Sequence, residues 1–489
     1  MSRSLGATAA TGSLWLGLVN LVSKGCQMAV VLVLAAFVTE GELGLVTLAV
    51  SLVNVGQVVQ SMGVYDVVTR TERDVRAMAG TVLSLSLVVG IALAAVGVLT
   101  AGPIATALGA PAAAPLIQLA SLSLPFSAAG GVQMGMMHRD LDFRRRMLPD
   151  AGSAVIGATV TVALAVTGLG AYSLAIGLLC AAVLQPVLGA VAGVRIKPAW
   201  DPRAAAEAMR WIRVVGPAAV VANLLINIDY PVISRVLGPD AVGIYSLAYR
   251  IAWVPYITVA IVLGAVAFPV YTTLLRNGRG TDLRDAVSRF TRVVLVVVGG
   301  MYLLAALLSD RVVLLGERWQ PAAGVLVLLC GYGLGISLLQ TWYEAIRAAG
   351  HPRWYLVLEV AHLMLLVVGL ALLTRHGVLA AAAAQVGAAW LLVPVAGWVL
   401  VRAGIAPPIR ELARGVTGLA AAGFVCWLVE AGLDRSGLLG SPGSLAGATA
   451  EGAVLLLCYA GITLAINRSA VRELRRLWSP GHRTVGGAR

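Results

Sequence analysis

The chain has 489 residues, of which 59% are hydrophobic and 12% are charged, and its formal net charge is +13. Soluble domains carry about 25% charged residues, so this composition excludes a water-soluble globular fold. The hydrophobic residues form blocks of about 20 or more, long enough to cross about 30 Å of hydrocarbon as helices. Runs such as 293–308 lack the alternation of a membrane barrel strand. The sequence therefore predicts an all-α polytopic membrane protein.

Fourteen blocks meet this length requirement. In chain order they predict transmembrane helices at 11–37, 43–65, 77–101, 113–137, 147–168, 171–194, 211–236, 242–274, 287–309, 321–346, 354–374, 378–401, 412–432 and 446–466. No loop between them exceeds about 20 residues, whereas an extramembrane domain needs about 50 or more. Any function must therefore lie among the helices.

Arginine and lysine residues are distributed unevenly between the loops. Of the 36, 29 lie in alternate loops and at the two ends, and the opposite loops hold only Arg235, Arg311, Arg318, Arg375 and Arg435. Loops rich in arginine and lysine remain on the cytoplasmic side. Because the number of spans is even, both termini are predicted to be cytoplasmic.

Four short motifs recur in the same order about 200 residues apart, which indicates an internal duplication. They are 44–49 with 243–248, 64–70 with 270–276, 133–139 with 340–347, and 168–175 with 377–380. A repeat with an even number of spans inserts both copies the same way up. The chain is therefore predicted to form an N-lobe at 1–200, a C-lobe at 201–404, an appended helix pair at 405–467 and a basic cytoplasmic tail at 468–489.

The most specific stretch runs from Asn227 to Arg250, and it is accompanied by the loop 139–144 and the paired glycine motifs before spans six and twelve. These features resemble the multidrug/oligosaccharidyl-lipid/polysaccharide exporter superfamily and, within it, the Wzx-like polysaccharide flippases. The resemblance covers essentially the whole chain and implies a MATE-like fold. It also implies that the protein moves an undecaprenyl-diphosphate-linked oligosaccharide to the outer leaflet of a bacterial plasma membrane, for cell-surface polysaccharide biosynthesis.

The resemblance implies no enzymatic step and no cofactor, and the implied partners are the polyprenyl-diphosphate-linked glycan, membrane lipids and a polysaccharide polymerase or glycosyltransferases. No metal or nucleic-acid site is predicted, because the five cysteines are dispersed and the basic residues form no continuous surface.

Two alternative functions remain. One is a cation-coupled multidrug exporter of the same superfamily, against which the fourteen spans argue. The other is a polytopic glycosyltransferase or polymerase, against which the short loops argue.

Charged residues inside predicted spans are the first candidates for a substrate site, because such charges are costly in a bilayer and usually line a bundle interior. Lys24 lies past the middle of the first span, where it either attracts the diphosphate or pairs with a carboxylate or carbonyl group elsewhere in the lobe. Asp229 and Arg250 lie at similar depths on neighbouring spans. They are predicted to form an ion pair, which either locks the two helices or takes part in binding.

Amide side chains form a second group of candidates. Asn54 and Gln57 lie on the second span, and Asn223 and Asn227 lie one helical turn apart on the seventh. Amides hydrogen-bond sugar hydroxyls, but they also join transmembrane helices to one another. Both interpretations remain open.

Two further groups lie toward the predicted cytoplasmic side. Glu359 and His362 are three residues apart on span eleven and are candidates for proton or ion coupling, or form a satisfied polar patch. The arginines of the cytoplasmic loops attract anionic headgroups or only fix the topology. The candidate entrance residues are Arg139, Arg144, Arg145 and Arg347. In the same loop Asp140 and Asp142 imitate a glycosyltransferase DxD motif, without a nucleotide-binding domain beside them.

Overall fold

The computed structural model describes residues 22–23, 25–26, 29–61, 67–69, 71, 74–140, 142–278, 280–436 and 443–466, and every regular element within these ranges is a helix. Twelve of the described helices are long and apolar enough to cross a membrane, or thirteen if the pair Pro111–Ser121 and Leu124–Arg139, bent by 41°, counts as one span. They overlap the predicted spans from the second to the fourteenth. The first, 11–37, lies mostly outside the described residues. The prediction of an all-α polytopic fold is confirmed.

The chain divides into two compact units. Unit 1 comprises 1–250 and 363–381, and unit 2 comprises 251–362 and 382–489. The division passes through two helices, α12 (Pro239–Pro255) and α17 (Pro352–Leu373), and near the start of α18 (Val378–Arg402). The two repeats of six spans predicted from the sequence are a different division, and they stay a prediction.

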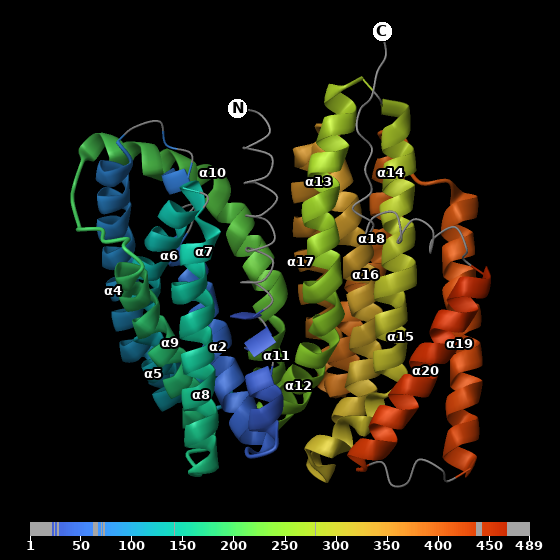
Figure 1. Cartoon of the computed structure of the whole chain (residues 1–489). Coiled ribbons are helices and arrows are strands. Elements are labelled where there is room, and N and C mark those ends of the chain that lie inside the picture. Colours follow the sequence, from blue (N-terminus) through green and yellow to red (C-terminus); the bar gives the residue numbers. More distant parts are fainter. Residues whose placement is uncertain are drawn as a thin grey trace. The chain divides into compact units, whose positions relative to one another are not determined.

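Unit 1 contains most of the blue to green helices of Figure 1. Three of its helices begin at an aspartate whose carboxylate accepts a hydrogen bond from a backbone N–H of the first turn: Asp74 before α4, Asp142 before α7 and Asp201 before α10. Besides the first part of α12 and the parts of α17 and α18 within 363–381, its helices are α2 (Glu40–Ser61), α4 (Val75–Ala107), α5 (Ala114–Ser121), α6 (Leu124–Arg139), α7 (Phe143–Met147), α8 (Ser153–Val166), α9 (Ala171–Val191), α10 (Pro202–Asn227) and α11 (Asp229–Leu237).

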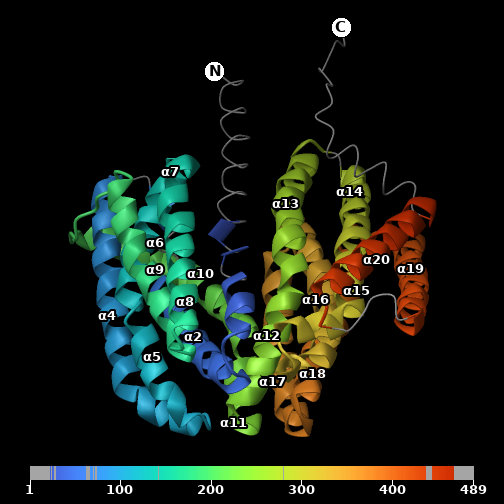
Figure 2. The same cartoon turned by 60° about the horizontal axis from the view of Figure 1, so that its bottom comes forward.

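Small residues bring α8 and α9 into close contact, and the two helices lie side by side in Figure 2. A Cβ atom at Gly157 would lie 2.7 Å from the carbonyl oxygen of Gly177 and 2.7 Å from the Cβ of Ala181. A Cβ atom at Gly177 would collide with the Thr161 hydroxyl group. Small residues at such positions let membrane helices approach closely, since packing is the main attraction between them.

Two copies of the repeated sequence motif meet where α2 and α12 begin. A Cβ atom at Gly44 would collide with the backbone of Pro239, and one at Gly243 would collide with the carbonyl of Glu40. One turn further on, the Thr47 hydroxyl donates to the Ser246 hydroxyl at 3.3 Å, across 199 positions of sequence. That spacing is also the offset between the copies at 44–49 and 243–248. Equivalent residues of the two copies thus contact one another, as they do at a two-fold axis.

Unit 2 begins with the end of α12, 251–255, and a π-helical turn, Tyr256–Ala260, follows directly after Pro255. A second π-helical turn, Val294–Val298, joins α14 to α15. The core helix of unit 2 is α16 (Ala322–Ala348). In its most apolar stretch, 67% of the residues are buried. The other helices are α13 (Ile261–Arg276), α14 (Gly280–Val293), α15 (Gly299–Leu307), α17 to residue 362, α18 from residue 382, α19 (Ile409–Ser436) and α20 (Leu445–Ile466).

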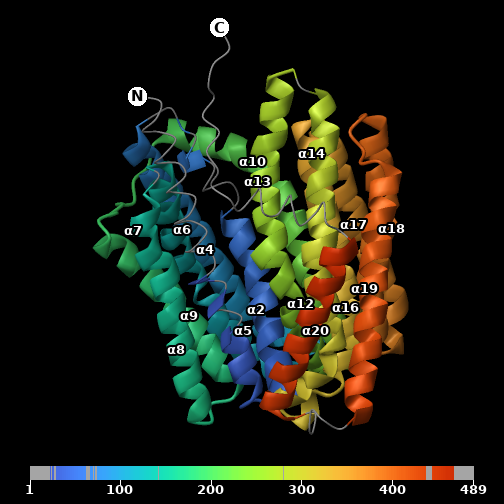
Figure 3. The same ribbon diagram turned by 45° about the vertical axis from the view of Figure 1, so that its right-hand side comes forward.

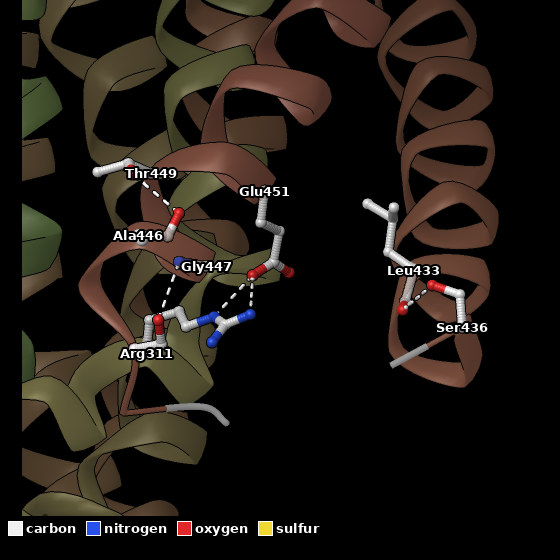
Figure 4. Close-up of polar contacts among 8 residues, drawn as sticks. Arg311, Leu433, Ser436, Ala446, Gly447, Thr449 and Glu451 are labelled. Atoms are coloured by element: carbon white, nitrogen blue, oxygen red, sulfur yellow. Dashed lines mark hydrogen bonds and ion pairs between the residues drawn. The ribbon is translucent and has the colours of Figure 1, made fainter. Parts of the chain in front are cut away.

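The appended pair, α19 and α20, lies side by side in Figure 3 and packs on the ninth predicted span. A Cβ atom at Gly300 would collide with the ring of Tyr459, and that tyrosine hydroxyl donates to the carbonyl of Val296 at 2.5 Å. Ion pairs fix each helix near its start: Arg292 with Glu411 on α19 at 2.6 Å, and Arg311 with Glu451 on α20 at 2.7 Å (Figure 4). The pair is therefore an integral part of unit 2.

Candidate functional site

Unit 1 encloses a pocket of about 380 Å³ beside the middle of α2, α8 and α9. Its walls are mainly small and aliphatic side chains, which is typical of ligand pockets that place a few polar groups in an apolar surround. The polar residues that line it are Asn54, Gln57, Ser123, Thr161 and Arg250. Three of these five were candidates from the sequence. Nothing in the sequence distinguished Ser123 or Thr161 from other hydroxyl residues in the spans.

Arg250 is the one charged residue among the described residues that line this pocket. Its Nε atom is buried and has no hydrogen-bond partner in the described part of the chain. A buried donor of a charged group that lacks a partner carries a large desolvation cost. The pocket is therefore electrostatically suited to an anion.

Three of the four predicted amides form one chain of hydrogen bonds. Asn54 Nδ2 donates to Asn227 Oδ1 at 3.4 Å, and Asn227 Nδ2 donates to the carbonyl oxygen of Asn223 at 3.0 Å. Gln57 donates from Nε2 to the Ser127 hydroxyl at 2.9 Å. Asn54 and Gln57 line the pocket, whereas Asn223 and Asn227 support Asn54 from α10. Both readings of these amides, cavity lining and helix joining, thus apply to Asn54.

No ion pair joins Asp229 and Arg250 in the described part of unit 1, so the predicted pair does not form. Asp229 is fully buried at the first position of α11, directly after the break that ends α10 at Asn227. Its Oδ1 accepts a hydrogen bond from the backbone N–H of Tyr230 at 3.0 Å. Asp229 thus lies at the start of a separate helix, which the prediction of one continuous span did not include. Lys24 lies outside the described residues.

The predicted entrance arginines have different surroundings. Arg139 donates from Nη1 to the carbonyl oxygens of Val68, Thr69 and Thr71, at 3.2, 3.4 and 2.7 Å. It therefore holds the segment between α2 and α4 in place. Arg144 is exposed, and Arg145 pairs with Asp142 at 3.2 Å while its side chain stays 65% exposed.

Both aspartates of the DxD-like motif lie at helix ends. Asp140 is the C-terminal cap residue of α6. Asp142 is the N-terminal cap of α7, where its carboxylate accepts a hydrogen bond from the Arg145 backbone N–H at 3.2 Å. Aspartate is a preferred residue at an N-terminal cap. Capping accounts for Asp142 in this loop.

A second polar cluster lies in unit 2, on α16 and the first part of α17. Glu344 accepts hydrogen bonds from Arg347 and, at 3.0 Å, from Gln340 Nε2. The Arg347 guanidinium also stands 5.3 Å from the ring centre of Tyr355, close to Glu359. His362 is buried and its Nε2 atom has no partner in the described residues, and no hydrogen bond joins it to Glu359 there. The cluster thus contains Arg347 and Glu359 but does not connect Glu359 with His362.

These helices and this pocket define a polytopic membrane protein of the transporter type. Its fold matches that of the lipid II flippase MurJ in an inward closed conformation over 95% of this chain and 100% of that protein, with a TM-score of 0.77 at 13% identity. A MATE family multidrug resistance transporter of the MOP superfamily, in an inward-facing conformation, matches 79% of this chain and 94% of its own, with a TM-score of 0.60 at 15% identity. The MATE-like fold is confirmed.

Residues 33–324 match the model of the polysaccharide biosynthesis protein family, and the chain belongs to this family. It is 26% identical to the succinoglycan biosynthesis transport protein ExoT of Rhizobium meliloti (strain 1021) over 348 residues, which are 66% of this chain and 69% of that protein. It is 23% identical to the lipopolysaccharide biosynthesis protein WzxC of Escherichia coli (strain K12) over 352 residues, 70% of this chain and 68% of the relative. The resemblance to the Wzx-like proteins is confirmed.

Proposed function

We propose that this protein is a flippase that moves a polyprenyl-diphosphate-linked oligosaccharide from the inner to the outer leaflet of a bacterial plasma membrane. The observation that carries the proposal is the pocket of unit 1, in which Arg250 is the one charged residue among the described lining residues and is accompanied by neutral hydrogen-bonding side chains. The names of the relatives support the class of substrate: one is a transport protein of polysaccharide biosynthesis and one structural neighbour flips lipid II.

The pocket chemistry fits the polar head of such a lipid. An arginine donates several hydrogen bonds to phosphate oxygens in a fixed geometry. Asn54 and Gln57 offer donors and acceptors to sugar hydroxyls. A volume of about 380 Å³ lies at the low end of ordinary ligand pockets, so we assign it to the diphosphate and the first sugar. In this proposal Lys24 adds a second positive charge, and no bond in the substrate is broken.

In this proposal the substrate crosses the membrane by alternating access. The contact between α2 and α12 at Gly44 and Gly243 closes one end of the pathway, and it must separate for the substrate to leave. The arginine distribution assigns this end to the outer side of the membrane and both termini to the cytoplasm. Exposed Arg144 and Arg145 draw the anionic lipid to the inner side.

The first test is a strain from which the protein can be depleted. Depletion should reduce surface polysaccharide and should cause lipid-linked oligosaccharide to accumulate where reagents added outside the cell cannot label it. Re-expression should reverse both effects. Unchanged surface polysaccharide without accumulation of the lipid-linked intermediate would contradict the proposal, and a gain in drug sensitivity alone would favour the multidrug exporter.

A further inference from the structure

Unit 2 holds a partly buried group of ionisable side chains that the proposed substrate site does not use. Glu344 and Arg347 lie on α16, and Glu359 lies two turns into α17. Glu344 is 6% exposed although its helix is long and apolar enough to span a membrane. Ionisable residues in such positions are rare, because burying charge in a bilayer is costly, and they commonly mark ion and proton sites.

We propose that Glu359, beside the Glu344–Arg347 ion pair, is a proton-binding site. Proton uptake transfers H⁺ from water to a carboxylate oxygen of Glu359, with no other bond made or broken. The site requires no co-reactant other than the proton. It deepens the proposed function, on which it rests for its role, because a protonation step in one unit offers a means of driving transport.

The charges of the cluster do not balance without a proton. Glu344 and Glu359 carry two negative charges when ionised, and Arg347 carries one positive charge. In the described part of unit 2 the other titratable groups that face the two carboxylates are tyrosines, which are neutral: Tyr256, Tyr271, Tyr343 and Tyr355. The ionised cluster therefore has a net charge of −1 in an apolar surround, and one proton neutralises it.

The hydrogen bonds show which carboxylate takes the proton. Both oxygens of Glu344 already accept hydrogen bonds, one from Gln340 at 3.0 Å and one from Arg347. Two donors, one of them charged, favour the ionised form of that carboxylate. Glu359 has Tyr355 beside it but forms no ion pair within the described residues. Glu359 is therefore the group left without a counter-charge.

The cluster also contains a buried tyrosine hydroxyl group. The hydroxyl group of Tyr343 is buried without a hydrogen-bond partner in the described residues, and its residue is 4% exposed. Its ring packs edge-on against that of Tyr355, with ring centres 5.4 Å apart, which places it in the same cluster. Buried hydroxyl groups normally bond to protein or to ordered water. The Tyr343 hydroxyl group is therefore a donor of this cluster that no described side chain satisfies.

Infrared difference spectroscopy of the full-length protein in lipid nanodiscs tests the site without any glycolipid. Spectra are recorded as the pH is lowered at constant sodium, and as sodium is raised at constant pH. Acidification of the wild type should produce a carboxylic acid band that is lost in Glu359→Gln. The band should persist in Glu430→Gln, which removes a carboxyl group from α19 of the same unit. Thermal melting identifies any variant that fails to fold.

Glu344→Gln supplies an independent check. In this variant the cluster is neutral when Glu359 is ionised. The pH at which half of the Glu359 acid band has formed should therefore be lower than in the wild type. An unchanged acid band in Glu359→Gln, an unmoved midpoint in Glu344→Gln, or carboxylate bands that respond to sodium at fixed pH would each overturn the proposal. Because the measurement involves no substrate, a negative result leaves the flippase proposal standing, and a failure to flip lipid leaves the proton site standing.

Discussion

Arg139 and Arg144 are five residues apart in one predicted cytoplasmic loop, yet the structure gives them different roles. The Arg139 guanidinium donates to three carbonyl oxygens, whereas Arg144 is exposed. A hydrogen bond to a charged group contributes about 1.5–3 kcal/mol to stability. The structure therefore assigns Arg139 a stabilising role and leaves Arg144 available to anionic lipid.

The first prediction compares these two arginines. Arg139→Gln should lower stability by about 2 kcal/mol or more, because three carbonyl oxygens lose a charged donor. Arg144→Gln should leave stability unchanged. Thermal melting of the detergent-solubilised protein measures both. If Arg139→Gln melts with the wild type but transports slowly, Arg139 belongs to the entrance instead.

The sequence predicted the residues of the pocket less completely than it predicted the helices. The pattern of polar residues in apolar spans identified Asn54, Gln57 and Arg250, all of which line the pocket. It did not separate Asp229 from these three residues. The break between α10 and α11, which makes Asp229 the first residue of a new helix, has no marker in the hydropathy. Single hydroxyl groups such as Thr161 reach the pocket only through the close packing of α8 and α9.

At the scale of elements, hydropathy located the helices well. Each predicted span from 43–65 onward overlaps a described helix, since about 20 apolar residues have few other stable solutions in a bilayer. Within the eighth predicted span the structure has a π-helical turn directly after Pro255, and proline is a common cause of such local departures from the α-helix. The bend of 41° in the fourth span was not predicted, although Ser121, Ser123 and Pro125 stand at the break between the two helices.

The contact between α2 and α12 gives a second prediction. Thr47 and Ser246 share a hydrogen bond of 3.3 Å where the two copies of the repeated motif meet. In a background without the five native cysteines, Thr47→Cys with Ser246→Cys should form a disulfide on oxidation. If the two helices must separate in each transport cycle, the cross-link should stop lipid flipping, and a reductant should restore it.

Each single cysteine variant serves as the control for this experiment, since neither can form the intramolecular bond. Flipping by the fully cross-linked protein at the rate of the reduced protein would show that α2 and α12 stay together throughout transport. The gate would then lie elsewhere in the molecule.

At the scale of the whole molecule, family and fold class agree between sequence and structure. The chain belongs to the polysaccharide biosynthesis protein family and has the fold of the MOP superfamily. The appended pair, α19 and α20, had no derivable place in the sequence. The structure shows it fixed to unit 2 by Arg292–Glu411 and Arg311–Glu451.

The central claim is that this protein moves a polyprenyl-diphosphate-linked oligosaccharide across a membrane, with Arg250 binding the diphosphate. The most direct measurement reconstitutes the purified chain in vesicles that carry such a lipid with a fluorescent glycan, and follows loss of fluorescence to a membrane-impermeant quencher. Wild-type protein should make the inner pool accessible, Arg250→Gln should abolish this effect, and Arg435→Gln, an exposed arginine at the end of α19, should not. Equal movement in empty vesicles and in vesicles with wild-type protein, or full activity of Arg250→Gln, would contradict the account.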